Sequence, residues 1–220
     1  MKAIRKTLIK TLSLDSIPFI LASSSPRRVS LLEQVGMRVE ICAPFSDEKA
    51  LRGEKPQALV HRLALEKALS VREIVLKKNR TCFILAADTI VVEPMGRKIL
   101  GKPRNEAEAR RMLGQLAGKT HTVLTGYCIL LADQFETDRK RVRVVSSRVK
   151  MRSLDAKTIR QYVASGEPMD KAGSYAAQGL GTALIESIQG SYTNVVGLPV
   201  TQVLKDLETD FGIPLFNWAR

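Results

Sequence analysis

A chain of 220 residues, of which 45% are hydrophobic and 26% charged, has the composition of a folded globular protein and is long enough for one sizeable core. No apolar run approaches the length of a membrane-spanning helix, and three widely spaced cysteines with two scattered histidines support neither a disulfide framework nor a zinc site. The net charge of +13 indicates a polyanionic ligand, such as nucleic acid or the phosphates of a nucleotide, or a charged surface in contact with water.

The chain begins with a segment rich in lysine and arginine, residues 1–16. The apolar stretch that follows, residues 17–22, is too short and too interrupted by Pro18 for the core of a secretory signal. We therefore divide the chain into a basic N-terminal extension, residues 1–16, and a single α/β domain, residues 17–220. Its expected location is the reducing cytoplasm.

The first motif ends a short apolar strand, where residues 21–28 read Leu-Ala-Ser-Ser-Ser-Pro-Arg-Arg. Ser25 is suited to cap a helix that begins at Pro26, because proline at the first helical position has no N–H to lose, and Gly36 ends the helical pattern. Such a turn directs backbone N–H groups, serine hydroxyls and guanidinium groups at one point, which suits a phosphate. A capped surface helix with solvated arginines explains the same pattern, and both interpretations stay open.

A long helix is predicted to begin at Pro56, because apolar residues recur at helical spacing after it. Lys67 lies on the apolar face of this helix. A lysine on a buried face needs a partner or a ligand, unless its stem packs while its amine reaches water. Ahead of the helix, Asp47 and Glu48 form an acidic pair in a loop, as plain loop charges or as part of a site.

The next motif interrupts an apolar strand. Residues 82–87 read as a buried strand and residues 90–92 continue it, with Asp88 and Thr89 between them. An unpaired carboxylate in such surroundings costs on the order of several kcal/mol, so Asp88 is expected to meet a cation, a metal or the water of a cleft. A turn residue in a hairpin is the alternative. Lys102 follows in a Gly-Lys-Pro sequence.

The second half of the chain continues the alternation of helices and strands that is typical of an α/β protein. Hydrophobic periodicity and glycine positions predict helices over 105–116 and 155–165, strands over 120–131, 141–151 and 183–188, and a last helix after Pro199. In residues 141–144 arginines alternate with valines, which predicts a solvated arginine face. A glycine-rich loop, residues 166–181, contains Lys171, Tyr175 and Gln178 and can bring its backbone close to a ligand.

Several of these features together match the donor set of a magnesium–triphosphate site: the serine–arginine turn, the acidic pair Asp47 and Glu48, Lys67, and Asp88 followed by Lys102. Mg²⁺ prefers carboxylate oxygens and shares its coordination shell with water and substrate phosphates. A carboxylate beside the metal can take a proton from an attacking water, while the cationic side chains stabilise the charge on the phosphoryl oxygens.

The motifs also carry a family resemblance. In order, they are Leu-Ala-Ser-Ser-Ser-Pro-Arg-Arg at 21–28, Ala-Ala-Asp-Thr-Ile-Val at 86–91, Gly-Lys-Pro at 101–103, Gly-Glu-Pro at 166–168, Lys-Ala-Gly-Ser-Tyr at 171–175, Gln-Gly at 178–179, Gly-Ser-Tyr at 190–192 and Val-Val-Gly-Leu-Pro at 195–199. From about Phe19 to Leu207 the chain resembles the Maf family of nucleoside triphosphate pyrophosphatases.

The resemblance implies a fold and a reaction. The fold is an α/β structure with a mixed β-sheet flanked by helices, in two lobes around a long cleft, similar to the inosine triphosphate pyrophosphatases. The reaction is hydrolysis of a nucleoside triphosphate between its α and β phosphates, to a monophosphate and pyrophosphate, with a divalent metal cation, Mg²⁺ or Mn²⁺. Members of the family are often dimeric, so a homodimer is expected, and no membrane partner is implied.

The resemblance also implies roles for single residues. Asp88 is the general base and a metal ligand, with Glu48 as the other metal ligand. Ser23, Arg27, Lys67 and Lys102 bind phosphates, and the two lysines complete the catalytic set.

Three positions, Arg27, Thr89 and Gln178, carry the residues of the branch that acts on dTTP and UTP. The side-chain amide of Gln178 can pair with both the carbonyl and the N–H of a thymine or uracil edge. For Arg28, the second arginine of the turn, we expect a structural salt bridge.

Two alternatives stay open. One is a pyrophosphatase of the same family that acts on methylated GTP. The other is a basic nucleic-acid-binding or cell-division regulatory protein, suggested by the net charge and by the basic residues within 139–152. The sequence disfavours nucleic acid as a partner, because its aromatic residues are few and are not interleaved with these charges.

Overall fold

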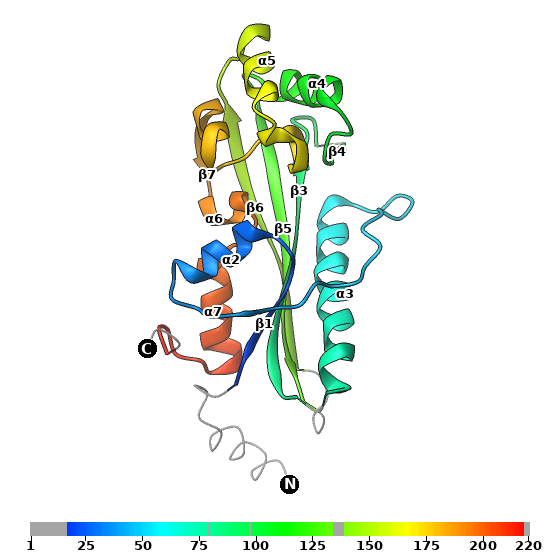
Figure 1. The fold of residues 1–220 in the computed structure, drawn as a ribbon, viewed down its shortest axis with the longest axis vertical. Coiled ribbons are helices and arrows are strands. Elements are labelled where there is room, and N and C mark those ends of the chain that lie inside the picture. The colour runs from blue at the N-terminus through cyan, green and yellow to red at the C-terminus, as the bar shows by residue number, and fades with distance from the viewer. Residues whose placement is uncertain (1–16, 79, 97, 134–138, 218–220) are drawn as a thin grey trace.

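The computed structural model describes residues 17–78, 80–96, 98–133 and 139–217, so the basic extension predicted for residues 1–16 lies outside them. In these ranges a mixed seven-stranded sheet runs along the molecule with helices on both faces (Figure 1). This confirms the expected α/β fold with a mixed sheet. The strands are β1 (Phe19–Ala22), β2 (Glu40–Ile41), β3 (Cys82–Val92), β4 (Ile99–Leu100), β5 (Thr120–Ala132), β6 (Arg139–Met151) and β7 (Ile185–Gln189).

The helices lie in two groups along the sheet, which gives the two lobes (Figure 1). The first group contains α2 (Pro26–Glu33), α3 (Pro56–Leu76) and α7 (Val200–Phe211), with α3 on the sheet face opposite to α2 and α7. The second contains α4 (Glu106–Leu116) and α5 (Ala156–Ala164), which pack on the other end of the sheet. Short 3-10 helices at Glu167–Asp170, Ala172–Ser174 and Gly179–Leu184 pack with this second group, and α6 (Tyr192–Val196) lies between the two groups (Figure 1).

In the described residues, the order of strands leaves a short stretch along one edge of β3 without β1 or β4 beside it. The sheet order is β2-β1-β3-β5-β6-β7, with β4 also paired to β3. β1 is parallel to β2 and β3, whereas the other pairs are antiparallel. β1 pairs with β3 as far as Ala22 opposite Ala86, and β4 pairs from Val91 onward. Among the described strands, neither β1 nor β4 pairs with the stretch of β3 between these positions, which includes Asp88 and Thr89.

The predicted interruption of this strand at Asp88 and Thr89 is wrong, because β3 runs through both residues. Asp88 lies opposite Gly126 of β5, and Thr89 lies opposite Thr125. Successive side chains of a strand point to opposite faces, so Asp88 faces α3 and Thr89 faces the side of α2 and α6. The sheet therefore holds the two polar residues rigidly and sends them to different faces.

The predicted arginine face on β6 lies opposite the valines and stays partly solvated, with the Arg141 and Arg143 side chains 42% and 41% exposed, but these arginines are also paired with α7. Arg143 donates two hydrogen bonds of 2.9 Å to the Asp206 carboxylate of α7, and Arg141 forms an ion pair with Asp210 of the same helix. Val142 packs toward the cluster that contains α3. The arginines lie on the opposite side because side chains alternate along a strand, and on that side α7 supplies their carboxylate partners.

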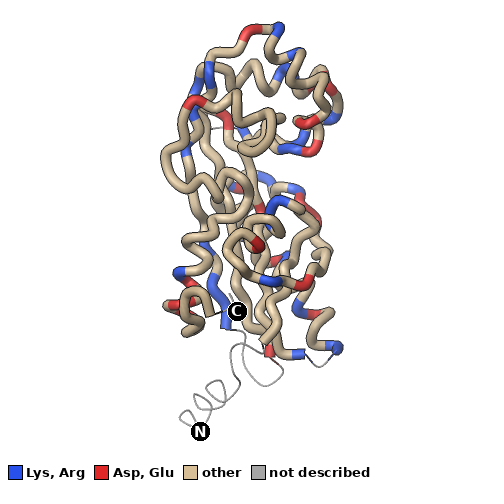
Figure 2. The backbone as a smooth tube through the Cα atoms, turned by 60° about the vertical axis from the view of Figure 1, so that its left-hand side comes forward, with Lys and Arg blue, Asp and Glu red and all other residues tan. Residues whose placement is uncertain are grey.

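The remaining surface features agree with the composition. Lysine and arginine residues lie along both lobes with acidic residues among them (Figure 2). None of the helices in the described ranges is both long and apolar enough to cross a membrane. All three cysteines fall in those ranges and are free thiols.

Candidate active site

A pocket of about 400 Å³ lies where β1 ends beside β3. Its walls come from the turn between β1 and α2, the loop before α3, the middle of β3, the loop after β4, the loop after α5 and the end of α6. The side chains and backbone groups of the sequence motifs meet here: Ser23, Ser24, Ser25, Arg27, Arg28, Glu48, Lys67, Asp88, Thr89, Lys102, Lys171, Tyr175 and Gln178 all line it.

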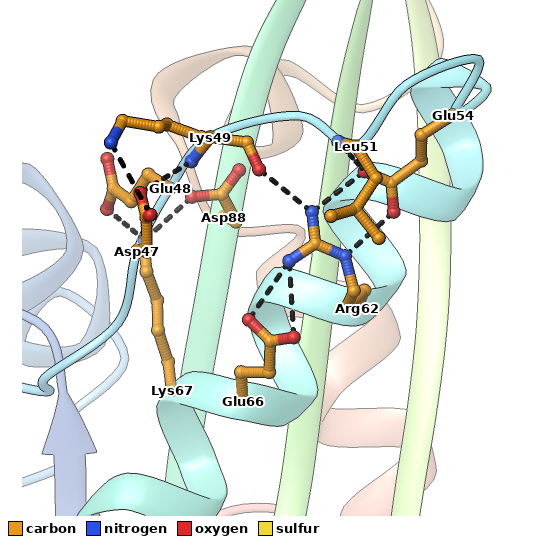
Figure 3. Close-up of polar contacts among 9 residues, drawn as sticks. All are labelled: Asp47, Glu48, Lys49, Leu51, Glu54, Arg62, Glu66, Lys67 and Asp88. Carbon is orange, nitrogen blue, oxygen red and sulfur yellow. Dashed lines mark hydrogen bonds and ion pairs between the residues drawn. The ribbon is translucent and has the colours of Figure 1, made fainter.

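The centre of the pocket is a lysine held between two carboxylates. The Nζ atom of Lys67 donates hydrogen bonds to Asp88 Oδ1 at 2.7 Å and to Glu48 Oε1 at 2.5 Å (Figure 3). Lys67 is 6% exposed and Asp88 7%, so this pair is shielded from bulk water, whereas the Glu48 side chain is 63% exposed. The buried lysine thus has acidic partners and does not reach out to water.

Electrostatics keep the outer carboxylate ionised. The hydrogen bond from Lys67 lowers the pKa of the Glu48 carboxyl below its ordinary value, against the opposing effect of partial burial, and Lys102 and Arg28 lower it further. Asp47, the other acid of the loop, is exposed and pairs with Lys49 at 3.7 Å. Glu48 is therefore the acid of this pair that faces the pocket.

The donor set of the pocket fits a divalent metal held partly by substrate. Glu48 and Asp88 each bond to Lys67 Nζ through one carboxylate oxygen, so the two carboxyl groups lie close together, and hard cations such as Mg²⁺ prefer oxygen ligands. Among the described residues, no group of three or more acidic, histidine or cysteine side chains is arranged to hold a metal. The arrangement suits Mg²⁺ bound through one or two carboxylates and completed by water and phosphate oxygens rather than an all-protein cage.

The turn after β1 opens a helix end toward the pocket. Pro26 is the first residue of α2 as predicted, but the Ser25 side chain makes no capping hydrogen bond to the described residues of the helix, so that part of the prediction is wrong. Instead, Ser23 Oγ accepts the Ser25 N–H at 3.2 Å, and the Ser25 carbonyl accepts the N–H groups of Arg28 and Val29. The N-terminal end of α2 carries a partial positive charge that favours an anion.

Arg28 reaches deep into the site, and the expected salt bridge is replaced by bonds to neutral oxygens. Its guanidinium donates to the carbonyl of Gly197 at 2.8 Å, to Ser23 Oγ at 2.9 Å and to Thr89 Oγ1 at 3.3 Å. Burial lowers the pKa of Arg28 below its usual value, while nearby Asp88 opposes that change. The sequence pattern predicts only a salt bridge for Arg28, although its place in the same turn as Ser23 is a signal for a role in the pocket.

Arg27 lies at the rim and faces the other lobe. Its guanidinium is 3.5 Å from the carboxylate of Asp170, which also forms an ion pair with Lys171. Arg27 and Arg28 are adjacent in sequence, yet one spans the mouth of the pocket and the other lies against β3. The structure brings Arg27 to the pocket, as the sequence predicted, with its charge shared with Asp170.

The two remaining specificity candidates differ in their surroundings. Thr89 Oγ1 forms hydrogen bonds with Thr125 Oγ1 at 2.9 Å and with the Gly197 carbonyl at 3.2 Å, so its hydroxyl links β3 to β5 and to the end of α6. Gln178 lines the pocket from the loop after α5, near Tyr175. Lys102 lines it from the loop after β4. The site residues proposed from the sequence, Ser23, Arg27, Glu48, Lys67, Asp88, Thr89, Lys102 and Gln178, therefore all line one cavity, whereas Asp47 does not.

One further pair behind the pocket carried no sequence signal. The ring nitrogen Nε2 of His121 in β5 forms a hydrogen bond of 2.7 Å with the hydroxyl of Tyr175, and both side chains are buried. Ser174, next to Tyr175, has a left-handed backbone with φ of 62°, which a non-glycine residue seldom adopts. The loop that presents Tyr175 and Gln178 is thus held by the sheet.

Comparison with known proteins places the chain among characterised families. It is 45% identical over 198 residues to a dTTP/UTP pyrophosphatase of Symbiobacterium thermophilum, covering 90% of this chain and 96% of that protein. It is 45% identical over 201 residues to one of Gloeobacter violaceus, covering 91% and 100%, and 42% identical over 203 residues to one of Pasteurella multocida, covering 90% and 98%.

Similarity to solved structures is weaker. A nucleoside-triphosphatase described as a dITP/XTP pyrophosphatase from Mycobacterium abscessus matches at a TM-score of 0.37 and 12% identity, over 93% of this chain and 100% of that one. By contrast, the family model described as Maf-like protein matches residues 18–209, nearly all of the described chain. With this match over most of the chain and with these relatives at 42–45% identity, the chain belongs to the Maf family.

Proposed function

We propose that this protein is a nucleoside triphosphate pyrophosphatase that acts on dTTP and UTP. The observation that carries the proposal is the buried Lys67 held between Asp88 and Glu48 in a pocket that also receives the N-terminal end of α2 and the guanidinium of Arg28. Carboxylates for a metal and water lie next to cationic groups for phosphates. The curated relatives that cover most of the chain are named dTTP/UTP pyrophosphatases, which supports the same reaction.

Asp88 is the proposed general base. It accepts the proton of a water molecule while the water oxygen forms a new bond to one of the two phosphorus atoms that share the α–β bridging oxygen. The bond between that phosphorus atom and the bridging oxygen breaks, which gives a nucleoside monophosphate and pyrophosphate. Lys67 holds Asp88 in place through its 2.7 Å hydrogen bond. Glu48 and Asp88 would hold Mg²⁺ or Mn²⁺, which when bound neutralises phosphate charge and makes its water more acidic.

The cationic groups of the pocket bind the triphosphate. The N–H groups at the start of α2, together with Ser23 and Arg28, surround one end of the cavity, and Lys102 and Arg27 lie at its other walls. Because Arg28 donates to neutral oxygens in the described residues, its positive charge is available to the substrate. Charge that builds on phosphoryl oxygens during bond breakage is stabilised by these preorganised groups.

Gln178 is the proposed reader of the base. Its amide lines the pocket beside Tyr175, and an amide offers one acceptor and two donors to the carbonyl and N–H of thymine or uracil. Thr89 and Arg27 complete the specificity set proposed from the sequence. Replacement of Gln178 by Ala removes this pairing and is expected to reduce kcat/KM for dTTP and UTP about tenfold or more relative to that for other nucleotides.

The test is pyrophosphate release from a panel of canonical and modified nucleoside triphosphates with Mg²⁺ or Mn²⁺. For Asp88→Asn we expect kcat on dTTP to fall by a factor of roughly 10²–10⁴, the usual loss when a positioned base is removed. Asp47→Asn is the matched control, since Asp47 is exposed and pairs with Lys49, and its rate should stay near that of the wild type.

Three results would contradict the proposal. Inactivity of the wild type on every nucleotide, or an undiminished rate in Asp88→Asn, would exclude the proposed reaction or its base. Methylated GTP as by far the best substrate would retain the reaction and overturn the specificity. The homodimer and the cytoplasmic location stay predictions, which sedimentation velocity and cell fractionation can test.

A further inference from the structure

Arg62 of α3 ties the loop that carries Glu48 to the helix that carries Lys67. Its Nε and Nη2 atoms donate to the two carboxylate oxygens of Glu54 at 2.8 and 2.7 Å, and Nη2 also donates to the backbone carbonyl of Lys49 at 3.1 Å (Figure 3). One guanidinium group therefore contacts the loop at two residues, Glu54 and Lys49. Lys49 is the residue that directly follows Glu48.

Glu54 and Arg62 form further hydrogen bonds, one within the loop and two within the helix. Glu54 also accepts the backbone N–H of Leu51 at 3.0 Å, so the bound carboxylate closes a turn of the loop. The Glu66 carboxylate, one helical turn after Arg62, accepts two bonds of 3.1 Å from Nη1, the guanidinium nitrogen that makes none of these bonds to the loop. The side chains of Arg62 and Glu54 are only 23% and 9% exposed, so water competes weakly for these bonds.

Glu48 lies in a loop without regular secondary structure, so the position of its backbone depends on tertiary contacts of the loop. Residues 42–51, all of them described, contain no helix or strand, and most of the Glu48 side chain is exposed. Holding a carboxylate of this kind at one place costs conformational entropy. Before Glu48, the N–H of Phe45 donates to Ser70 Oγ of α3 at 3.2 Å. After Glu48, Arg62 supplies the second anchor, so the loop is fixed to α3 on both sides of the acid.

We propose that Arg62 is a positioning residue, which fixes residues 49–54 on α3 and thereby holds the Glu48 carboxylate at the pocket as a metal ligand. This inference rests on the proposed function, since it concerns the same site. Arg62 lies outside the described lining of the pocket, so it acts through the position of Glu48 and not on the substrate. The same helix thus supplies Lys67, which bonds to Glu48 directly, and Arg62, which holds its loop.

The first measurement follows the loop without metal or nucleotide. In Arg62→Gln, the amides of Leu51 and Glu54, whose N–H groups bond to the Glu54 carboxylate and to the Leu51 carbonyl, should exchange hydrogen at least about tenfold faster than in the wild type, because the attachment of their loop to α3 is lost. The amides of α3 should keep their protection. Glu54→Gln, which removes the other half of the ion pair, should give a similar loop-specific change.

The second measurement is the Mn²⁺ or Mg²⁺ concentration at half-maximal rate of pyrophosphate release. We expect it to rise about tenfold in Arg62→Gln, the lower end of the loss seen when a group that orients a metal ligand is removed. The kcat at saturating metal should change less, because Asp88 and Lys67 stay in place. Arg62→Lys should rescue little, since a lysine cannot bridge Glu54 and the Lys49 carbonyl with a planar fork.

Two control variants separate the loop contact from other effects. Glu66→Gln weakens the brace within α3 but keeps both bonds to the loop, so loop exchange and metal dependence should stay close to those of the wild type. Arg110→Gln removes a similar surface pair, Arg110 with Glu106 at 3.0 Å in α4, and should change neither readout.

The outcomes are distinguishable. A wild type that hydrolyses no nucleotide would overturn the proposed function and with it the metal-ligand role, while the exchange data would still report whether Arg62 holds the loop. An active Arg62→Gln with unchanged loop exchange and unchanged metal dependence would overturn the inference and leave the proposed function intact. Equal effects of Glu66→Gln and Arg62→Gln would assign the loss to helix α3 and would also overturn it.

Discussion

The two cationic side chains deepest in the pocket, Lys67 and Arg28, differ in the partners that they have. Lys67 lies between two carboxylates, whereas Arg28 donates to a carbonyl and two hydroxyls. Taking a cation out of water is costly unless an anion compensates it. The positive charge of Lys67 is thus compensated within the protein. That of Arg28 faces a pocket that an anionic substrate would enter.

His121 provides a residue-scale prediction about pH. Burial lowers its pKa from 6.5 to about 4, so the folded protein keeps the imidazole neutral while the unfolded chain protonates it. Between these values the unfolded state binds more protons, so the free energy of unfolding rises with pH from about 4 to 6.5 and this contribution is constant above. We expect it to amount to about 3 kcal/mol, measured by urea unfolding at several pH values.

His121→Gln removes this titration, so the difference in unfolding free energy between the wild type and the variant should shrink as the pH falls through that window. His61, exposed on α3, offers the matched control, and His61→Gln should follow the wild-type curve. Parallel curves for the wild type and His121→Gln would show that the buried histidine does not account for the pH dependence.

At the scale of elements, the site depends on how closely α3 packs on the sheet. Gly126 of β5 lies opposite Asp88, and a Cβ at this position would be only 2.0 Å from the backbone carbonyl oxygen of Val60 in α3. The missing side chain lets the helix approach the strand. This approach brings Lys67, further along α3, within hydrogen-bond distance of Asp88.

Gly126→Ala is therefore expected to force α3 away from β5. We predict a loss of about 3 kcal/mol in the free energy of unfolding, the upper part of the usual range for overpacking, and a lower kcat because Lys67 moves relative to Asp88. Gly114→Ala in α4 is the control with the opposite sign. Its Cβ would meet no atom within 4 Å, so removal of a helical glycine should stabilise by roughly 0.5–1 kcal/mol. Chemical denaturation of both variants tests the pair.

At the scale of the whole molecule, the pocket lies between the two lobes and is lined by residues of both. The β1–α2 turn, Lys67 and Asp88 belong to the lobe with α2, α3 and α7, whereas Lys102 and the loop with Gln178 come from the end with α4 and α5. The ion pair of Arg27 with Asp170 spans the same gap. A triphosphate in the pocket would contact both sides, so binding is expected to stabilise the fold as a unit.

This gives a prediction for thermal unfolding. A dTTP analogue with a methylene group in place of the α–β bridging oxygen, present with Mg²⁺ at about a hundred times its Kd, should stabilise the protein by about 2.7 kcal/mol. For a domain of this size that corresponds to a rise in Tm of about 5–10 °C. The same concentration of inorganic phosphate should give a much smaller rise, and an equal rise would argue against recognition of the whole nucleotide.

Net charge is also a property of the whole molecule, and the fold determines which of the charged side chains are paired with one another. Arg141 and Arg143, which contribute to the basic stretch of the sequence, are paired with Asp210 and Asp206 of α7. The nucleic-acid alternative therefore loses part of the surface that suggested it. It stays a prediction, for which duplex binding with a steep salt dependence would be the supporting result.

The amino-acid sequence by itself determined the helix start at Pro26, the α/β alternation, the family, and the need of Lys67 and Asp88 for partners. The helix start follows from local preferences and the need for partners from the cost of burying a charge, whereas the family follows from the resemblance of the ordered motifs. Tertiary structure decided that Glu48 rather than Asp47 meets Lys67 and that Arg28 reaches Thr89. Tertiary structure also determined that β3 continues through Asp88 and that α7 packs beside the arginines of β6. Such pairings join residues far apart in the chain, and strand register and helix docking fix them, whereas a local pattern does not.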